Sequence, residues 1–261
     1  MTNLSVNLNK VAMLRNARPL AIPSVVKMGE ISIAAGAHGL TVHPRPDERH
    51  IRRTDVYELA EMLKDHPTIE YNIEGNPLEP PFMDIVREVR PHQCTLVPDD
   101  PNQNTSDHGW NVIRDADKLR PIVETLHELG CRVSLFIDPE IEQIERVPDV
   151  GSDGSSLLVD RIELYTEPYA TAYRQGRGAE SFEVYRRAAE CAHAMGLGVN
   201  GGHDLNLENL PKFKEIPNLL EVSIGHALTA DALEMGFADA VKAYLKALGQ
   251  VCEIAKLENI D

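Results

Sequence analysis

The strongest constraint on the fold is a regular alternation of short apolar segments with longer helical patterns along the whole chain. The short segments have the length and apolar content of buried strands, and turn residues bound them. Strands are predicted at residues 4–8, 39–43, 70–74, 93–97, 132–138, 161–165, 198–200 and 220–224. Because strand–helix–strand units place their strands parallel with right-handed crossovers, eight such units predict an α/β fold closed as a (β/α)8 TIM barrel.

The segments between the strands carry apolar residues at every third or fourth position, as amphipathic helices do. Examples are residues 23–35, 55–65, 115–129, 179–195 and 231–257. We expect Pro23 in the first turn of its helix, and Gly36, Gly130 and Gly196 as left-handed caps directly after a helix. An open doubly wound sheet is the alternative, but the first strand lacks the Gly-x-Gly-x-x-Gly turn of dinucleotide-binding folds.

Length and composition fit one such barrel. The 261 residues match the roughly 250 that this fold needs, and no Ser/Gly/Pro-rich linker divides residues 1–261, so a single domain is expected. Hydrophobic residues (43%) and charged residues (26%) occur in the proportions of a globular protein. Since no apolar stretch approaches the roughly 20 residues that span a bilayer, and residues 1–8 resemble no export signal, we expect no membrane partner and no export.

The four cysteines, Cys94, Cys131, Cys191 and Cys252, have no paired spacing for zinc or redox chemistry. We interpret them as packing residues of a cytoplasmic protein, because the cytoplasm keeps thiols reduced. The formal charge of −15 argues against a nucleic-acid partner, since such proteins carry a basic surface that neutralises phosphates. The same charge repels anionic substrates, so any phosphate site must come from local arginines, lysines and helix N-termini.

Polar residues follow the predicted strands at their carboxyl ends, where the catalytic groups of a barrel lie. They are Asn7, Asn9 and Arg18 for the first strand, His43 and Arg45 for the second, Glu74 for the third, Glu163 for the sixth, Gly201, Gly202 and His203 for the seventh, and Gly225 and His226 for the eighth. Any one of them is also consistent with a polar group that closes the barrel. A whole ring favours function, because buried carboxylates and imidazoles are costly unless they are paired or used.

Glycines after the seventh and eighth strands favour phosphate binding. Gly201, Gly202 and Gly225 let backbone amides approach a phosphate closely, and a helix N-terminus follows. Further donors and positive charge are available from Arg18, Arg45, His50, His226 and Thr229. Tight turns and solvated surface are the alternative interpretation of these residues. Two anion sites would imply substrates that carry two phosphates.

Residues 98–111 form an unusually long polar loop, since two to six residues are usual after a barrel strand. One interpretation is a lid that closes over the barrel mouth and excludes water. The other is that Trp110, the single tryptophan, anchors this segment to the barrel or to another subunit. Residues 167–178 are a similar segment, with Arg174 and Arg177 expected on the solvated surface.

Six ordered motifs resemble those of the pyridoxine 5′-phosphate synthase family, from about residue 4 to the final helix. They are Val6-Asn7-Leu8 with residues 14–18 (LRNAR), residues 41–45 (TVHPR) with 49–51 (RHI), residues 72–75 (NIEG), residues 134–138 (SLFID), residues 199–203 (VNGGH) and residues 224–227 (IGHA). The resemblance implies condensation of 1-deoxy-D-xylulose 5-phosphate with 3-amino-2-oxopropyl phosphate to pyridoxine 5′-phosphate, phosphate and water. It implies no metal or organic cofactor, and a homo-octamer built from dimers.

The resemblance also implies roles for the residues at the strand ends. His43 and Glu74 would be general bases, His203 the proton donor, and Glu163 the group that stabilises a transition state. Arg45, His50 and Thr105 would hold the deoxyxylulose phosphate, whereas Asn7, Arg18, the residue after His203, Gly225 and His226 would hold the aminoketone phosphate.

Two positions depart from the family pattern. Asn9-Lys10 stands where an Asp-His pair is expected, so the side-chain roles there are open, and Lys10 could add positive charge to the deoxyxylulose phosphate site. Asp204 follows His203 where glycine is common. Its carboxylate could contact the substrate amine, but we favour a role for its backbone amide alone.

Two other functions remain open. A metal-dependent barrel hydrolase or aldolase would use His43, Glu74, Asp138, Glu163 and His203 as ligands, but no His-x-His motif or compact ligand spacing supports it. A Schiff-base aldolase would need a lysine at a strand end, and the interior strands offer none. A barrel that binds phosphorylated ligands without turnover is the non-enzymatic alternative, and intact candidate catalytic residues argue against it.

Overall fold

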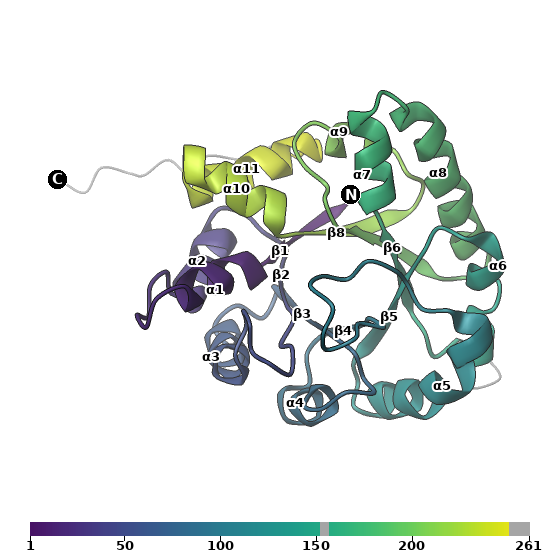
Figure 1. The fold of residues 1–261 in the computed structure, drawn as a ribbon, viewed down its shortest axis with the longest axis horizontal. Helices are drawn as coiled ribbons and strands as arrows, with labels where there is room; N and C mark the ends of the chain where they lie inside the picture. The colour runs from purple at the N-terminus through teal and green to yellow at the C-terminus, as the bar shows by residue number, and fades with distance from the viewer. Residues whose placement is uncertain (152–156, 251–261) are drawn as a thin grey trace.

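The computed structural model describes residues 1–151 and 157–250. In this part of the chain the strands are β1 (Asn3–Asn7), β2 (Gly39–Val42), β3 (Glu70–Gly75), β4 (Gln93–Leu96), β5 (Arg132–Ile137), β6 (Arg161–Tyr165), β7 (Gly198–Gly202) and β8 (Leu219–Ile224). All neighbouring pairs are parallel, and β8 pairs with β1, so the sheet closes (Figure 1). The predicted (β/α)8 barrel is therefore confirmed.

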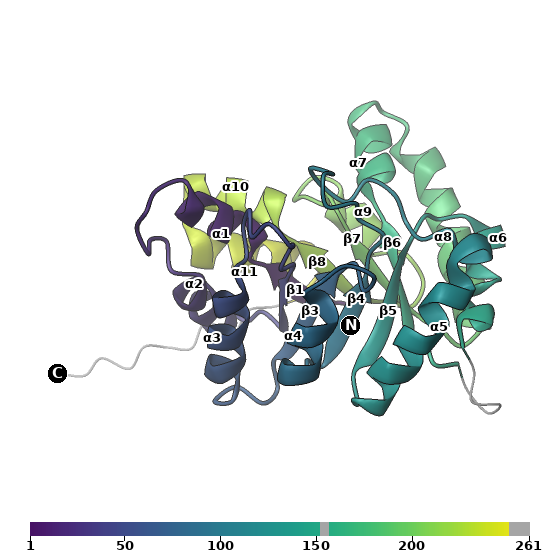
Figure 2. The ribbon, with the colours of Figure 1, turned by 60° about the horizontal axis from the view of Figure 1, so that its bottom comes forward.

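Helices surround the sheet on its outer side (Figure 1). They are α1 (Asn9–Asn16), α2 (Val25–Ala34), α3 (Arg53–Leu63), α4 (Phe82–Val89), α5 (Val112–Glu128), α6 (Ile141–Ile144), α7 (Glu167–Arg174), α8 (Gly178–Ala194), α9 (Leu210–Phe213), α10 (His226–Met235) and α11 (Phe237–Ala247), with a short 3-10 helix, η1 (Val147–Val150). Figure 2 shows α1 and α2 beside α10 and α11, so the first and the last described helices pack together on one side of the barrel. Among the described residues, no helix has the length and apolar content needed to cross a membrane.

The predicted strands agree with the observed ones to within a residue at most ends, and β7 differs most. It continues past the predicted end at Asn200 through Gly201 and Gly202, which pair with Val222 and Ser223 of β8. A side chain at Gly201 would meet the ring of Phe213 at 2.7 Å. The glycines therefore extend the strand because neighbouring side chains occupy the space on both of its faces.

The prediction for Pro23 was wrong. Helix α2 begins at Val25, and Ser24 is its N-cap, whose hydroxyl accepts a hydrogen bond from the Lys27 amide at 3.2 Å. A serine that satisfies a free amide of the first turn is a stronger start signal than the proline before it. The three predicted glycine caps are confirmed, because Gly36, Gly130 and Gly196 have φ values of 104°, 78° and 83°.

The predicted helix at residues 231–257 is two helices, α10 and α11, as far as residue 250; residues 251–257 and Cys252 lie outside the described residues. Gly236 separates them. Its φ is 88°, its amide donates to the Ala232 carbonyl at 2.9 Å, and its carbonyl accepts from Ala240 at 3.0 Å. A left-handed glycine ends one helix and lets the chain start the next at a new angle.

The inside of the barrel is more polar than that of most such folds, in which branched apolar residues dominate. Ser5, Thr41, Asn72 and Thr95 are buried on four consecutive strands. Their side chains form a chain of hydrogen bonds: Ser5 with Thr41 at 2.6 Å, Asn72 with Thr41 at 3.4 Å, and Thr95 with Asn72 at 3.1 Å. The apolar core lies instead between sheet and helices. Each of these four side chains has a partner on a neighbouring strand, which limits the cost of burying it.

Of the cysteines in the described residues, Cys94 and Cys131 are buried and Cys191 is half-buried, and all are free thiols. Their burial agrees with the interpretation of these residues as packing groups.

Candidate active site

A cavity of about 300 Å³ opens at the carboxyl ends of the strands. The predicted site residues that line it are Asn7, Asn9, Lys10, His43, Arg45, His50, Glu74, Thr105, Glu163, His203, Asp204, Gly225 and His226. These residues come from the ends of β1, β2, β3, β6, β7 and β8 and from the loop after β4. The ring of polar residues predicted from strand ends is thus brought together in one place.

Gly201, Gly202 and Thr229, which the sequence predicted near a phosphate, do not line this cavity, and neither does Arg18. Arg18 is exposed, in the segment between α1 and α2. Its neighbours Arg15 and Asn16 instead support the loop after β2: Arg15 forms a buried ion pair with Asp55, and the Asn16 amide donates to the His50 carbonyl at 2.8 Å. Much of the 14–18 motif therefore positions His50.

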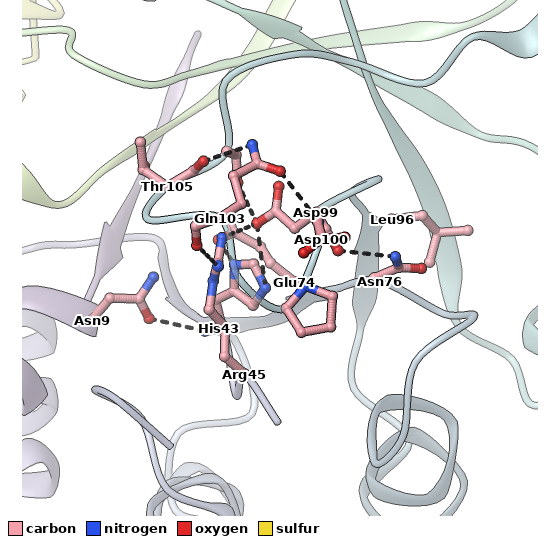
Figure 3. Close-up of polar contacts among 12 residues, drawn as sticks. Asn9, His43, Arg45, Glu74, Asn76, Leu96, Asp99, Asp100, Gln103 and Thr105 are labelled. Carbon is pink, nitrogen blue, oxygen red and sulfur yellow. Dashed lines mark hydrogen bonds and ion pairs between the residues drawn. The ribbon is translucent and has the colours of Figure 1, made fainter. Parts of the chain in front are cut away.

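Asn7 and Asn9 link β1 to the candidate bases. The Asn7 amide donates to Glu74 Oε2 at 3.3 Å, and Asn7 Oδ1 accepts from the backbone amide of Asn9 at 3.0 Å. Asn9 Oδ1 in turn accepts from the backbone amide of His43 at 2.9 Å (Figure 3). An amide oxygen accepts this hydrogen bond as an aspartate oxygen would, so the asparagine at residue 9 still contacts the backbone of His43.

His43 and Glu74 face each other, with His43 Nδ1 4.0 Å from Glu74 Oε2. Burial, followed by the charges of Asp99 and Glu221, raises the pKa of Glu74 to about 8. Burial, followed by the positive charge of Arg45, lowers the pKa of His43 well below its usual value. Both groups are therefore mainly neutral near pH 7, an acid beside a base, and a proton can pass between them or to a bound molecule.

Glu163 reaches the cavity from β6. Burial, followed by the charge of Glu74, raises its pKa well above the usual value. Its Oε2 is buried and has no hydrogen-bond partner among the described residues. A Cβ at Gly202 would lie 2.1 Å from Glu163 Oε1, so only glycine leaves room for this carboxyl group. Glu163 thus offers a neutral acid with an unused oxygen.

His203 and Asp204 follow β7 in left-handed conformations, with φ values of 95° and 57°. Such values are costly for residues with side chains and often mark functional sites. The Thr166 hydroxyl donates to the His203 carbonyl at 2.5 Å and holds this turn, and His203 Nε2 lies 3.2 Å from the hydroxyl of Thr105. The Asp204 carboxylate has a hydrogen bond with His203 that lowers the pKa of Asp204. Asp204 therefore keeps a negative charge beside His203, the predicted proton donor.

The N-terminus of α10 faces the cavity after Gly225, because Gly225, His226 and Ala227 all line it. A Cβ at Gly225 would lie 3.0 Å from Cβ and Oδ1 of Asn7. The buried hydroxyl of Thr229 has no partner among the described residues. Free amides and a hydroxyl at a helix start suit a phosphate. Burial, followed by the charges of Arg45 and Lys10, lowers the pKa of His50 to about 4, so the His50 imidazole adds a neutral donor.

The long loop after β4 lies over the cavity and is fixed at both ends. Arg45 pairs with Asp99 and donates to the Gln103 carbonyl (Figure 3). Asn104, Thr105 and Ser106 line the cavity. At the other end Trp110 is buried, and its indole N–H donates to the Leu96 carbonyl at 3.0 Å. Trp110 therefore anchors the loop to the barrel, while residues 104–106 are placed as a cover.

Sequence reasoning did not single out Asp99, Ser223 or Phe136. The sequence signal for Asp99 was its place soon after the fourth strand, at the rim where the catalytic groups of a barrel lie. Asp100 and Asp107 lie in the same polar loop, and nothing in the sequence distinguishes Asp99 from them. Phe136 and Ser223 line the cavity from β5 and β8. Among the described residues, no group of three or more His, Cys, Asp or Glu side chains is arranged to hold a metal ion.

A family model described as "Pyridoxal phosphate biosynthesis protein PdxJ" matches residues 4–250. The chain belongs to the PdxJ family. It is 49% identical over 255 residues to the pyridoxine 5′-phosphate synthase of Albidiferax ferrireducens, with 95% of this chain and 98% of that protein covered. The synthase of Mesorhizobium japonicum is 52% identical over 249 residues (94% and 98% covered), and that of Porphyromonas gingivalis 50% over 245 (94% and 98%).

Solved structures of other barrels share the fold at low sequence identity. A tryptophan synthase α-subunit from Pyrococcus furiosus has a TM-score of 0.61 at 11% identity, covering 95% of this chain and 97% of that one. A thiamine phosphate pyrophosphorylase from the same organism has a TM-score of 0.57 at 12% identity, covering 95% of both chains. At this identity the likeness shows the barrel alone.

Proposed function

We propose that this chain is a pyridoxine 5′-phosphate synthase, a transferase that condenses 1-deoxy-D-xylulose 5-phosphate with 3-amino-2-oxopropyl phosphate. The products are pyridoxine 5′-phosphate, inorganic phosphate and water, in the biosynthesis of pyridoxal phosphate (vitamin B6). One observation carries the proposal: in a PdxJ chain, His43, Glu74, Glu163 and His203 come from four different strand ends to line one cavity. The identity with named synthases over nearly the whole chain supports the same reaction.

The reaction needs repeated proton transfer, and the four residues supply it. An amine attacks a ketone, water leaves, an enol forms and expels phosphate, and ring closure removes more water. His43 and Glu74 act as general bases, His203 as proton donor, and Glu163 stabilises a transition state through its neutral carboxyl group. Each such group typically contributes about 10²- to 10⁴-fold in rate. These steps form carbon–nitrogen and carbon–carbon bonds and release water and phosphate with no net oxidation or reduction, so we propose no cofactor and no metal.

Two phosphate sites account for the remaining predicted residues. Arg45, His50 and Thr105, with Asn9 and Lys10 beside them, hold the deoxyxylulose phosphate. The aminoketone phosphate is held by Asn7, Asp204, Gly225, His226 and Arg18. Because Arg18 is outside the cavity, its part requires that the segment after α1 turns inward. These local donors offset the repulsion from a chain of formal charge −15.

We further propose that the enzyme is a cytoplasmic homo-octamer, a tetramer of dimers, with small phosphorylated substrates as its partners. The family resemblance supports the assembly, and light scattering of the purified protein tests it. A single monomeric species would contradict it.

The activity is tested by incubating the purified protein with both substrates in the presence of EDTA. We expect pyridoxine 5′-phosphate and inorganic phosphate in equal amounts. Product formation that requires an added divalent ion would favour the metal-dependent barrel, and folded protein that binds the substrates without turnover would favour a binding module.

A further inference from the structure

His43 has a carboxyl group on each side of its imidazole. Nδ1 lies 4.0 Å from Glu74 Oε2, and Nε2 lies 3.9 Å from Asp99 Oδ2. Glu74 lines the large cavity, whereas Asp99 lines a separate void of about 20 Å³ behind His43, together with Arg45 and Asn76. The ring therefore separates the reactants from Asp99, and Asp99 has no predicted role.

Asp99 is held in one orientation by several partners. Its side chain is 4% exposed. Oδ2 accepts from the Ser106 hydroxyl at 2.8 Å. It also pairs with Arg45, and the Asp99 carbonyl accepts from the Asn76 amide at 3.0 Å (Figure 3). Its other oxygen, Oδ1, is buried without a partner among the described residues. A buried carboxylate with an unused oxygen is costly unless a further donor reaches it.

A hydrogen on His43 Nε2 would face Oδ2, the oxygen that Arg45 and Ser106 also contact, and not the unpartnered Oδ1. A carboxylate in an ion pair only accepts hydrogen bonds, and a neutral imidazole has one N–H and one bare nitrogen. If the bare nitrogen were Nε2, two acceptors would face each other across 3.9 Å. With the hydrogen on Nε2, the bare Nδ1 faces Glu74, which burial keeps protonated near pH 7. Both sides of the ring then have a donor opposite an acceptor.

We propose that Asp99 is a positioning residue for the general base: its carboxylate holds His43 in the Nε2–H tautomer and leaves the lone pair of Nδ1 toward Glu74 and the reactants. When Nδ1 takes a proton, the ring becomes positive, and the carboxylate on its far side stabilises that charge. This is the logic by which the aspartate of a Ser-His-Asp triad orients its histidine. The gap of 3.9 Å closes through one water in the void, which has room for it, or by shortening when substrate binds.

Asp99 also links the base to the loop that covers the cavity. It is part of the polar loop after β4, and Ser106 and Gln103 of that loop contact Asp99 or its partner Arg45. Thr105 contacts His203 at 3.2 Å. The loop that covers the cavity therefore also carries the orienting carboxylate, which couples the position of the loop to the orientation of the base.

This inference rests on the proposed synthase activity, and its test separates the two. Asp99→Asn keeps the shape and removes the charge, and Asp99→Glu restores a carboxylate. Asp107→Asn is the matched control, because it removes the same charge from the same loop at a side chain that is 61% exposed and does not line the cavity. We expect kcat of Asp99→Asn to fall on the order of 10²-fold with KM for each substrate within about threefold, partial recovery in Asp99→Glu, and a change within about threefold in Asp107→Asn. A fall in apparent affinity for the deoxyxylulose phosphate at unchanged kcat would show that Asp99 serves Arg45 alone and would overturn the proposal.

A spectroscopic readout needs no turnover. The ¹⁵N shifts of the His43 ring, assigned by their loss in His43→Gln, report which nitrogen carries the hydrogen in the resting enzyme. We expect Nε2–H in the wild type and a mixture of tautomers in Asp99→Asn. The groups that face or act on this ring are Glu74, Asp99, Arg45, Arg49, His50 and His203, so the shifts are read at one pH for all variants. A wild-type ring with the hydrogen on Nδ1 overturns the inference whether or not the protein makes pyridoxine 5′-phosphate.

Discussion

At the scale of single residues, burial sets the chemistry of the candidate site. Glu74, Glu163 and His43 are all removed from water, and burial is the first cause of each pKa shift. It favours the neutral form of the carboxyl groups and of the imidazole alike. The site therefore holds acids and bases that are neutral together, which is suited to chemistry that moves protons many times.

Glu74→Gln tests the role of the most central acid. We expect kcat to fall about 10²- to 10⁴-fold, because the amide cannot accept the proton. In the wild type the base form is the ionised one, so kcat/KM should rise as pH increases toward the pKa of about 8. Steady-state rates between pH 6 and 9 check this. Undiminished turnover of the variant, or a wild-type profile that falls over this range, would contradict the assignment.

Gly202→Ala tests the space reserved for Glu163. The added methyl group would lie 2.1 Å from Glu163 Oε1, so the carboxyl group must move and activity should fall at least as far as in Glu163→Gln. The double variant Gly202→Ala/Glu163→Ala removes the clash, and we expect it to recover thermal stability but not activity. Melting temperatures and rates of the three variants give the comparison. Full activity in Gly202→Ala would show that Glu163 is not needed where it lies.

At the scale of elements, local patterns predicted the strands well and the loops poorly. The alternation that defined residues 161–165 gives β6 with the same bounds, because apolar and polar residues alternate there with the period of a strand. The end of β7 was missed because its last residues, Gly201 and Gly202, look like a turn until Phe213 and Glu163 are known to fill the space beside them. Such information lies in residues far along the chain.

The residues of the candidate site likewise differ in how well the sequence predicts them. Residues at strand ends, such as His43 and Glu74, could be predicted because the barrel fixes where strand ends meet. Asp99 could not, because its partners Arg45 and Ser106 come from a different strand end and from further along the loop. Arg18 follows the motif yet is exposed, since the sequence does not say how the chain leaves α1.

Trp110→Phe tests the anchor of the long loop. The substitution keeps an aromatic ring but loses the hydrogen bond to the Leu96 carbonyl, which typically contributes about 1 kcal/mol. We expect faster amide hydrogen exchange in residues 98–111 and a lower kcat, with little change elsewhere in the barrel. Mass spectrometry of exchanged peptides measures the first effect. Unchanged exchange in this loop would show that its contacts with Arg45 suffice to hold it.

At the scale of the whole molecule, buried acids at two depths of the barrel couple stability to pH. Burial raises the pKa of Glu74 and of Glu221 to about 8, Glu221 lying beside Arg161 at 3.1 Å. When the pKa of an acid is higher in the folded protein than in the unfolded chain, the difference does not change the free energy of unfolding below the unfolded pKa near 4.5. The free energy of unfolding falls as pH rises from there toward about 8, and it stays at the lower value above that pH. The protein should therefore lose stability between these pH values, by at most about 1.4 kcal/mol per pH unit for each group.

Glu74→Gln removes one of these groups and isolates its share. We expect the variant and the wild type to have similar melting temperatures at pH 5, and the variant to be the more stable by a margin that grows up to pH 8 and then stays level. Glu61→Gln is the matched control, because the Glu61 side chain is 73% exposed and its substitution should give no pH-dependent difference. Scanning calorimetry from pH 5 to 9 measures all three proteins. A margin that is the same at every pH would mean that Glu74 titrates alike in the folded and unfolded chain, and the acid–base pair proposed for it and His43 would then lack its physical basis.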